Sequence, residues 1–127
     1  YKRQAPNCRA DRINAHSVEF FRVLRDAHPD VPVVIVEHPL YPTMRLNNAE
    51  REDIIARNNA QKAFYETLRK AGEKRIYYVS AEKLLDEMKE GTVDGDHFTD
   101  LGVTYYVKAV MPTIKKALKA SPNKVGK

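Results

Sequence analysis

Two short apolar runs limit the fold of this chain more than any other feature. Residues 31–36 (VPVVIV) form a continuous run that is rich in β-branched side chains, and residues 75–79 (RIYYV) form the second run. Continuous apolar runs, as opposed to alternating ones, are typical of parallel strands that helices cover on both faces. The sequence therefore predicts a parallel sheet inside an α/β domain.

Helical segments surround and separate the two predicted strands. Apolar residues recur with helical spacing over residues 10–28, 49–71 and 99–120, with Thr99 as the expected cap of the last helix. A short helix over residues 81–89 is expected to be capped by Ser80. The predicted inner face of the long middle helix consists of Ile54, Ile55, Phe64 and Leu68. The order helix–strand–helix–strand–helix is that of a doubly wound α/β domain.

Length and composition favour one soluble globular domain. The chain has 127 residues, of which 43% are hydrophobic, and no apolar run approaches the ~20 residues of a membrane-spanning helix. Two strands alone do not make an independently stable sheet, because their faces and edges need partners. We therefore expect residues 1–120 to be the C-terminal portion of a flavodoxin-sized domain, completed by a missing N-terminal segment or by another chain.

The basic charge is concentrated at the end of the chain. The formal net charge is +5, and residues 115–127 hold five lysines and no acidic residue. The rest of the chain is therefore close to neutral. Nucleic-acid binding would need basic side chains spread over a face, so we interpret residues 121–127 as a solvated basic tail and expect neither a nucleic-acid nor a membrane partner.

The residues with the clearest chemical pattern are 93–102 (VDGDHFTDLG). Asp94 precedes His97 by three residues on a glycine-containing turn, so its carboxylate can fold back onto the imidazole. It would accept from Nδ1–H, fix the tautomer and leave Nε2 as a general base. The alternative is a turn in which Asp94 only caps the backbone and His97 is a surface residue.

Calcium binding is a second alternative for the same segment. Asp94, Asp96 and Asp100 have the rhythm of a calcium loop, but its sixth position is Thr99 instead of glycine and its twelfth is Tyr105 instead of glutamate. An EF-hand is therefore excluded. We expect no metal site and no organic cofactor.

The pattern D-G-x-H-x-T-D-x-G, followed by a C-terminal amphipathic helix, resembles the last conserved block of the SGNH (GDSL-type) hydrolases. Residues 5–8 (APNC), with the following helix and LRDAHPDVPVVIVEHP, resemble one branch of these acyl-hydrolases. The resemblance extends from Pro6 to about Leu118. It implies a three-layer α/β/α sandwich with a flavodoxin-like parallel sheet, incomplete at the N-terminus. It also implies His97 as catalytic base, Asp94 as its orienting acid and Asn7 as an oxyanion-hole donor.

The nucleophile of that family has no counterpart in these residues. Family members carry a Gly-Asp-Ser block, whereas Ser17, Ser80 and Ser121 are not preceded by Gly-Asp. The resemblance therefore implies a serine esterase or acyl-hydrolase whose substrate is a carboxylic ester, for example of a carbohydrate or another small alcohol. We expect residues 1–127 alone to be inactive. The alternative function is a non-catalytic α/β interaction module, in which the basic tail and the open sheet edge recruit a partner.

Several other residues follow the first predicted strand and are candidates for a substrate pocket. His38 comes directly after that strand, and Tyr41, Met44 and Arg45 lie in the long polar loop beyond it. Loops at the carboxyl end of parallel strands are where α/β proteins place their sites. The same loop residues equally suit a solvated loop, and Asn7 equally suits a turn after a proline.

Overall fold

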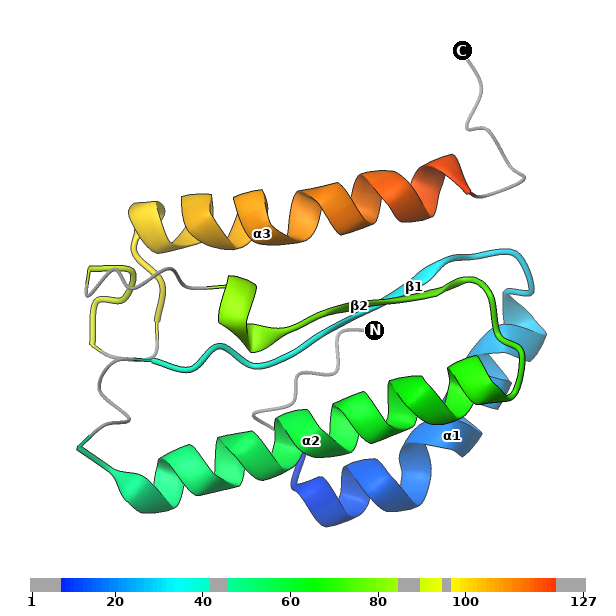
Figure 1. Cartoon of the computed structure of the whole chain (residues 1–127), viewed down its shortest axis with the longest axis horizontal. Helices are drawn as coiled ribbons and strands as arrows, with labels where there is room; N and C mark the ends of the chain where they lie inside the picture. The colour runs from blue at the N-terminus through cyan, green and yellow to red at the C-terminus, as the bar shows by residue number, and fades with distance from the viewer. Residues whose placement is uncertain (1–7, 42–45, 85–89, 95–96, 121–127) are drawn as a thin grey trace.

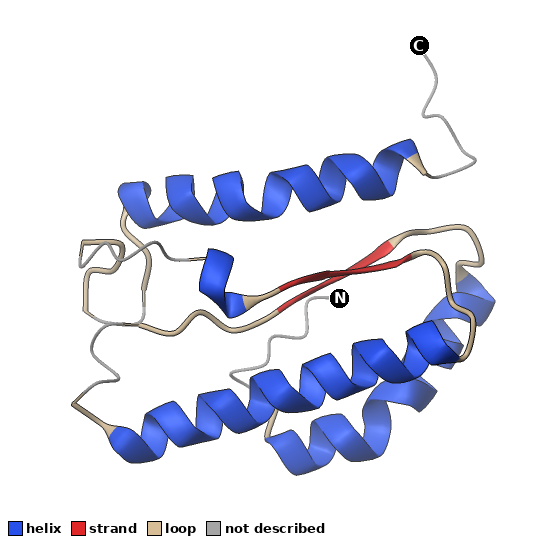
Figure 2. Cartoon of the chain, viewed as in Figure 1, coloured by secondary structure: helices blue, strands red, loops and turns tan. Residues whose placement is uncertain are grey.

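The predicted order of helices and strands is present in the structure. The computed structural model describes residues 8–41, 46–84, 90–94 and 97–120. Figure 2 shows the helices and strands of these residues, and the short helix after the second strand is a 3₁₀-helix, η3. In chain order they are α1 (Ala10–Ala27), β1 (Val33–Val36), α2 (Asn48–Lys70), β2 (Ile76–Val79), η3 (Ala81–Lys83) and α3 (Asp100–Lys119).

The two strands pair in parallel, which confirms the predicted sheet. Val33 lies opposite Ile76, and Val36 lies opposite Val79. β1 begins two residues later than predicted, because Val31 is half exposed and Pro32 has no N–H to donate to the sheet. No further strand lies beside β1 or β2 among the described residues, and the four side chains of β1 are only half-buried.

Helices cover both faces of this sheet. Figure 1 shows α1 and α2 on one side of the strands and α3 on the other. The core on the first side contains Phe21, Leu68 and Ile76, packed with Val33 and Ile35. The core on the second side contains Val79, Leu84 and Val110, packed with Val34 and Val36. Alternate β1 side chains therefore point to opposite faces, and the fold is the predicted three-layer α/β/α arrangement.

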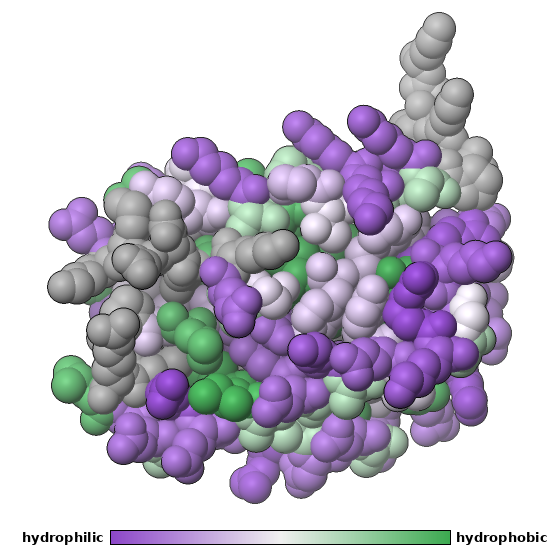
Figure 3. Space-filling model, in the orientation of Figure 1, coloured by the Kyte–Doolittle hydropathy of each residue, from purple (hydrophilic) through white to green (hydrophobic). Residues whose placement is uncertain are grey.

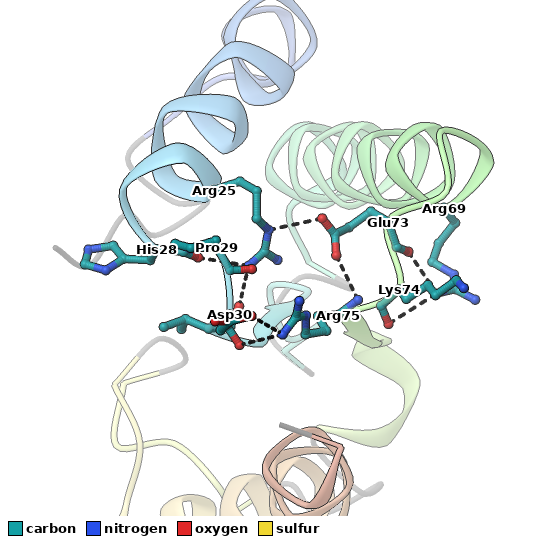
Figure 4. Close-up of polar contacts among 9 residues, drawn as sticks. Arg25, His28, Pro29, Asp30, Arg69, Glu73, Lys74 and Arg75 are labelled. Atoms are coloured by element: carbon teal, nitrogen blue, oxygen red, sulfur yellow. Dashed lines mark hydrogen bonds and ion pairs between the residues drawn. The ribbon is translucent and has the colours of Figure 1, made fainter. Parts of the chain in front are cut away.

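The amino ends of the strands are held by a network of charged residues, which Figure 4 shows. Nε of Arg25 lies 3.1 Å from Oε2 of Glu73, and Nη1 of Arg75 lies 2.6 Å from Oδ1 of Asp30. Nη1 of Arg25 also donates to the carbonyl oxygens of residues 28, 29 and 31. The network ties the segment before β1 to the segment before β2.

The predicted cap of the short helix is wrong. Ser80 precedes η3 but makes no side-chain cap hydrogen bond. The Ala81 N–H instead donates to Oε2 of Glu37, at 2.6 Å, and the Tyr78 hydroxyl donates to the other oxygen of that carboxylate. Glu37 therefore satisfies the first N–H of η3, while the Ser80 side chain caps none of them. η3 ends at Lys83, and residues 85–89 of the predicted helix lie outside the described residues.

Candidate functional site

Asp94 and His97 contact each other in the loop of residues 91–99, which lies at the carboxyl end of the strands beside the start of α3 (Figure 1). Nδ1 of His97 is 2.8 Å from Oδ2 of Asp94, and the His97 backbone N–H donates to Oδ1 at 2.9 Å. An ionised carboxylate only accepts hydrogen bonds, so Nδ1 carries the proton in this contact. The lone pair of the neutral ring is then on Nε2, as a general base requires.

The Asp94–His97 pair is accessible from solvent. The His97 side chain is 78% exposed and the Asp94 side chain is 55% exposed. Exposed ion pairs contribute little to stability, and this pair joins two residues of a single turn. The pair is therefore open to proton exchange with solvent, and the stability of the hydrophobic core does not depend on it.

The backbone of the loop is closed below this pair. The Val93 N–H donates to the His97 carbonyl oxygen at 2.8 Å, and the Thr99 N–H donates to the Gly91 carbonyl oxygen at 3.1 Å. Thr92 and Phe98 form an antiparallel bridge between these two hydrogen bonds. The two ends of the loop are thus held together as in a small hairpin. These contacts fix the backbone position of His97.

The start of α3 fixes the same loop from the other side. The Thr99 hydroxyl accepts from the Gly102 N–H at 3.0 Å, which confirms Thr99 as the cap, and donates to the Glu90 carbonyl at 2.9 Å. A Cβ atom on Gly102 would lie 1.9 Å from the Gly91 carbonyl oxygen. Gly102 therefore lets the first helical turn approach the loop closely. A larger residue at this position of the motif would collide with the loop backbone.

Aromatic rings connect the loop to the end of β1. The Phe98 and Tyr41 rings meet edge to face with centroids 6.2 Å apart, and the Tyr41 and His38 rings meet in the same way at 5.4 Å. Tyr41, Ile54 and Phe98 form one core cluster. His38 and Tyr41, which the sequence suggested as pocket residues, are thus connected through Phe98 to the segment that carries His97. Both are buried, at 8% and 7% exposure.

Asn58 is a functional candidate that the sequence analysis missed. It lies on α2, is 6% exposed, and holds the backbone of His38 at both polar atoms. Its Oδ1 accepts from the His38 N–H at 2.9 Å, and its Nδ2 donates to the His38 carbonyl oxygen at 2.9 Å. The available signal was a polar residue one helical turn after Ile54, at a position where the apolar face of the helix continues.

Two tyrosines in this half of the molecule have raised pKa values. Burial and the hydrogen bond to Glu37 raise the pKa of Tyr78 far above its ordinary value. Burial alone raises the pKa of Tyr106, whose ring lies 5.4 Å from that of Phe98. Both hydroxyls are therefore neutral over the physiological range, and they bring no charge to the site.

The remaining sequence-predicted residues can be placed only in part. Asn7, Met44 and Arg45 lie outside the described residues, as does the basic tail of residues 121–127. Among the described residues, no three His, Cys, Asp or Glu side chains are arranged to hold a metal ion. No described helix has the length and apolar character to cross a membrane. A cavity of about 90 Å³ lies between α1 and α2, away from Asp94 and His97.

Comparison with known proteins identifies the family of the chain and supports the fold. The sequence profile of the GDSL-like lipase/acylhydrolase family matches residues 4–115. A Bacteroides ovatus protein described as a GDSL-like lipase has a similar crystal structure, with a TM-score of 0.83 and 35% sequence identity over 91% of this chain and 34% of the other. No curated protein matches the chain.

A more distant likeness supports the fold alone. The salicylyl-acyltransferase SsfX3 from a tetracycline biosynthetic pathway aligns with a TM-score of 0.69 and 16% identity, over 84% of this chain and 32% of the other. The chain thus spans about a third of the length of both solved structures.

Proposed function

Because the chain belongs to the GDSL-like lipase/acylhydrolase family, we propose that it carries the acid–base part of a serine ester hydrolase. The proposed general base is His97, and the proposed orienting acid is Asp94. The proposed oxyanion donor is Asn7. The substrate class is carboxylic esters, including acyl esters of carbohydrates or other small alcohols.

In the proposed reaction, Nε2 of His97 takes the proton of a serine hydroxyl as its oxygen attacks the ester carbonyl. The negative charge that forms on the carbonyl oxygen is stabilised by N–H donors, among them the Asn7 side chain. The protonated His97 then gives its proton to the leaving alcohol, and an acyl-serine remains. Water, activated by the same His97, releases the acid and restores the serine.

One observation carries this proposal. The 2.8 Å contact between His97 Nδ1 and Asp94 Oδ2 orients an exposed imidazole so that Nε2 has its lone pair. A histidine held in this way by a carboxylate, in a chain of this family, is the expected base of a Ser–His–Asp mechanism. A turn that needed only a cap would use the backbone contact to Asp94 Oδ1 and would leave the ring unconstrained.

Apolar surface near this end of the molecule supports an acyl substrate. Leu40 is 40% exposed and Leu46 is 92% exposed. Figure 3 shows hydrophobic surface around the start of α2, on the side of the molecule where the strands end. An acyl chain could be partly removed from water there, at about 25 cal/mol for each Å² of apolar surface buried.

The source of the nucleophilic serine must also be proposed, because the 127 residues contain no Gly-Asp-Ser. We propose that a preceding segment or another chain supplies the serine and completes the sheet. The open edges of β1 and β2 among the described residues support this, as do Val103, Val107 and Met111. These three exposed apolar side chains follow one another at four-residue spacing along α3.

A serine-reactive phosphonate probe tests the proposal on the protein expressed from its natural gene. We expect covalent labelling of one serine, and we expect His97→Ala to slow the labelling by orders of magnitude. His16→Ala, on the exposed surface of α1, is the matched control and should label as the wild type does. If the wild type is not labelled, the protein is not a serine hydrolase, and the interaction-module alternative takes its place.

A further inference from the structure

The segment after β1 is held in place from α2 by a buried amide. Four residues of α2 are buried, and Asn58 is the polar one among them; the others are Ile54, Ala60 and Leu68. Both of its polar groups are used on the backbone of His38, with two hydrogen bonds of 2.9 Å. A neighbouring strand would bond the N–H and the carbonyl oxygen of His38 in the same way. The Asn58 amide does so just beyond Val36, where the pairing of β1 with β2 ends. The backbone at His38 is therefore fixed relative to α2.

The fixed segment in turn supports the loop that carries His97. Nδ1 of His38 donates to the Pro39 carbonyl oxygen at 2.8 Å, which orients the imidazole ring. The edge of that ring meets the Tyr41 ring, and the Tyr41 ring meets Phe98. Edge-to-face aromatic pairs of this kind are worth about 0.5–1.5 kcal/mol each beyond their burial. Phe98 is the residue directly after His97, so the backbone of His97 rests on this stack.

We propose that Asn58, Tyr41 and Phe98 are positioning residues that set where the His97 imidazole stands. This inference rests on the proposed function of His97 as the base. Asp94 determines which nitrogen of the ring is protonated, but it lies in the same loop as His97 and moves with it. Among the described residues, the stack of Phe98 on Tyr41, anchored by Asn58, links the loop to α2 and to the end of β1, whereas Thr99 and Gly102 link it to α3. A displacement of about 1 Å in a catalytic group can reduce turnover 10²-fold.

The test compares two aromatic contacts of the same geometry. Phe98→Leu and Tyr41→Leu break the contact below His97, whereas Phe64→Leu breaks the Phe21–Phe64 contact, which is also edge to face at 6.2 Å but lies between α1 and α2. Three quantities are measured in the protein expressed from its natural gene: the ¹⁵N signals of the His97 ring, kcat and KM for a nitrophenyl ester, and Tm.

We expect Phe98→Leu and Tyr41→Leu to lower kcat about 10- to 100-fold with KM within about threefold, and to shift the ring ¹⁵N signals of His97. Phe64→Leu should lower Tm by a similar amount and leave kcat and the His97 signals unchanged. Tyr41→Phe, which keeps the ring, should lower kcat less than Tyr41→Leu does. Asn58→Ala should act as Tyr41→Leu does, and if it does not fold, the two aromatic variants decide.

The inference is overturned if Phe98→Leu and Tyr41→Leu change kcat and the His97 signals no more than Phe64→Leu does. Failure of the proposed function has a different signature. In that case His97→Ala leaves ester turnover unchanged, while the ¹⁵N signals still report whether the stack positions the ring.

Discussion

The two ends of the parallel sheet use polar residues in opposite ways. At the amino end, Arg25 and Glu73 are each only 18% exposed and connect segments that lie 48 residues apart. At the carboxyl end, Asp94 and His97 are 55% and 78% exposed and connect residues three apart in one loop. The first pair holds the fold together, and the second adds little to it.

This difference distinguishes polar residues that stabilise the fold from polar residues that are available for a reaction. At the amino end, the Arg25 and Arg75 guanidinium groups pair with the Glu73 and Asp30 carboxylates and join segments that are distant in the sequence (Figure 4). At the carboxyl end, Glu37 and Asn58 make structural polar contacts with the backbone of Ala81 and of His38. The His97 side chain at this end is exposed and contacts Asp94 of the same loop. The four predictions below test this division.

Gly102→Ala should have the largest effect on stability. The added Cβ would stand 1.9 Å from the Gly91 carbonyl oxygen, and backbone on both sides must move, so we expect a loss of at least ~3 kcal/mol in the free energy of unfolding. Gly72→Ala, at the amino end, is the control. Gly72 has φ 89° and open space around its Cβ position, so the cost should be only about 1–2 kcal/mol. Equal losses by urea denaturation would contradict the close approach of loop and helix.

Arg25→Ala should have the next largest effect. It removes the partner of the mostly buried Glu73 carboxylate and three hydrogen bonds to backbone carbonyls, and we expect a loss of about 2–3 kcal/mol. Ester turnover per folded molecule should not change. A fall in kcat without a fall in stability would show that the amino end has a role in chemistry.

Tyr78 should make stability depend on alkaline pH. Its pKa in the folded protein is raised above the ordinary value of 10.0, so above that pH the unfolded chain loses a proton that the folded chain keeps. This contribution is complete below pH 10 and is lost above it, by about 1.4 kcal/mol per pH unit. Unfolding measured between pH 9 and 11 should show this slope in the wild type, and a smaller one in Tyr78→Phe. Identical slopes would mean that Tyr78 ionises normally.

His97→Ala should have the smallest effect on stability. Its side chain is 78% exposed, and substitution at such a site is expected to change the free energy of unfolding by no more than ~0.5 kcal/mol. Urea denaturation of the two proteins gives the comparison directly. A loss as large as that of Arg25→Ala would remove the distinction between the two ends of the sheet.

The parts of this molecule that follow from local sequence could be predicted. The strands follow from continuous apolar runs, and Thr99 caps α3 because its acceptor role needs only the next helical turn. The Asp94–His97 contact follows from a spacing of three residues on a turn. In each case the partners are neighbours in the sequence, so residue type and spacing are sufficient.

The parts that depend on distant partners could not be predicted. Ser80 has the right residue type for a cap, but the side-chain acceptor at the start of η3 is Glu37, 44 residues from Ala81. The bonds between Asn58 and His38 span 20 residues and exist only because α2 packs beside the end of β1. Sequence spacing gives no register between these elements. Tyr41 likewise looked like a loop residue, and its burial comes from contacts with Phe98 and Ile54.

The central claim is that Asp94 and His97 form the acid–base pair of an ester hydrolase, and turnover of a nitrophenyl ester tests it most directly. In the protein expressed from its natural gene, we expect His97→Ala and Asp94→Asn each to lower kcat by about 10⁴-fold, with His16→Ala within about twofold of the wild type. Residues 1–127 alone should show negligible turnover. Turnover that survives in His97→Ala, or turnover by residues 1–127 alone that His97→Ala abolishes, would contradict the proposed division of the catalytic groups.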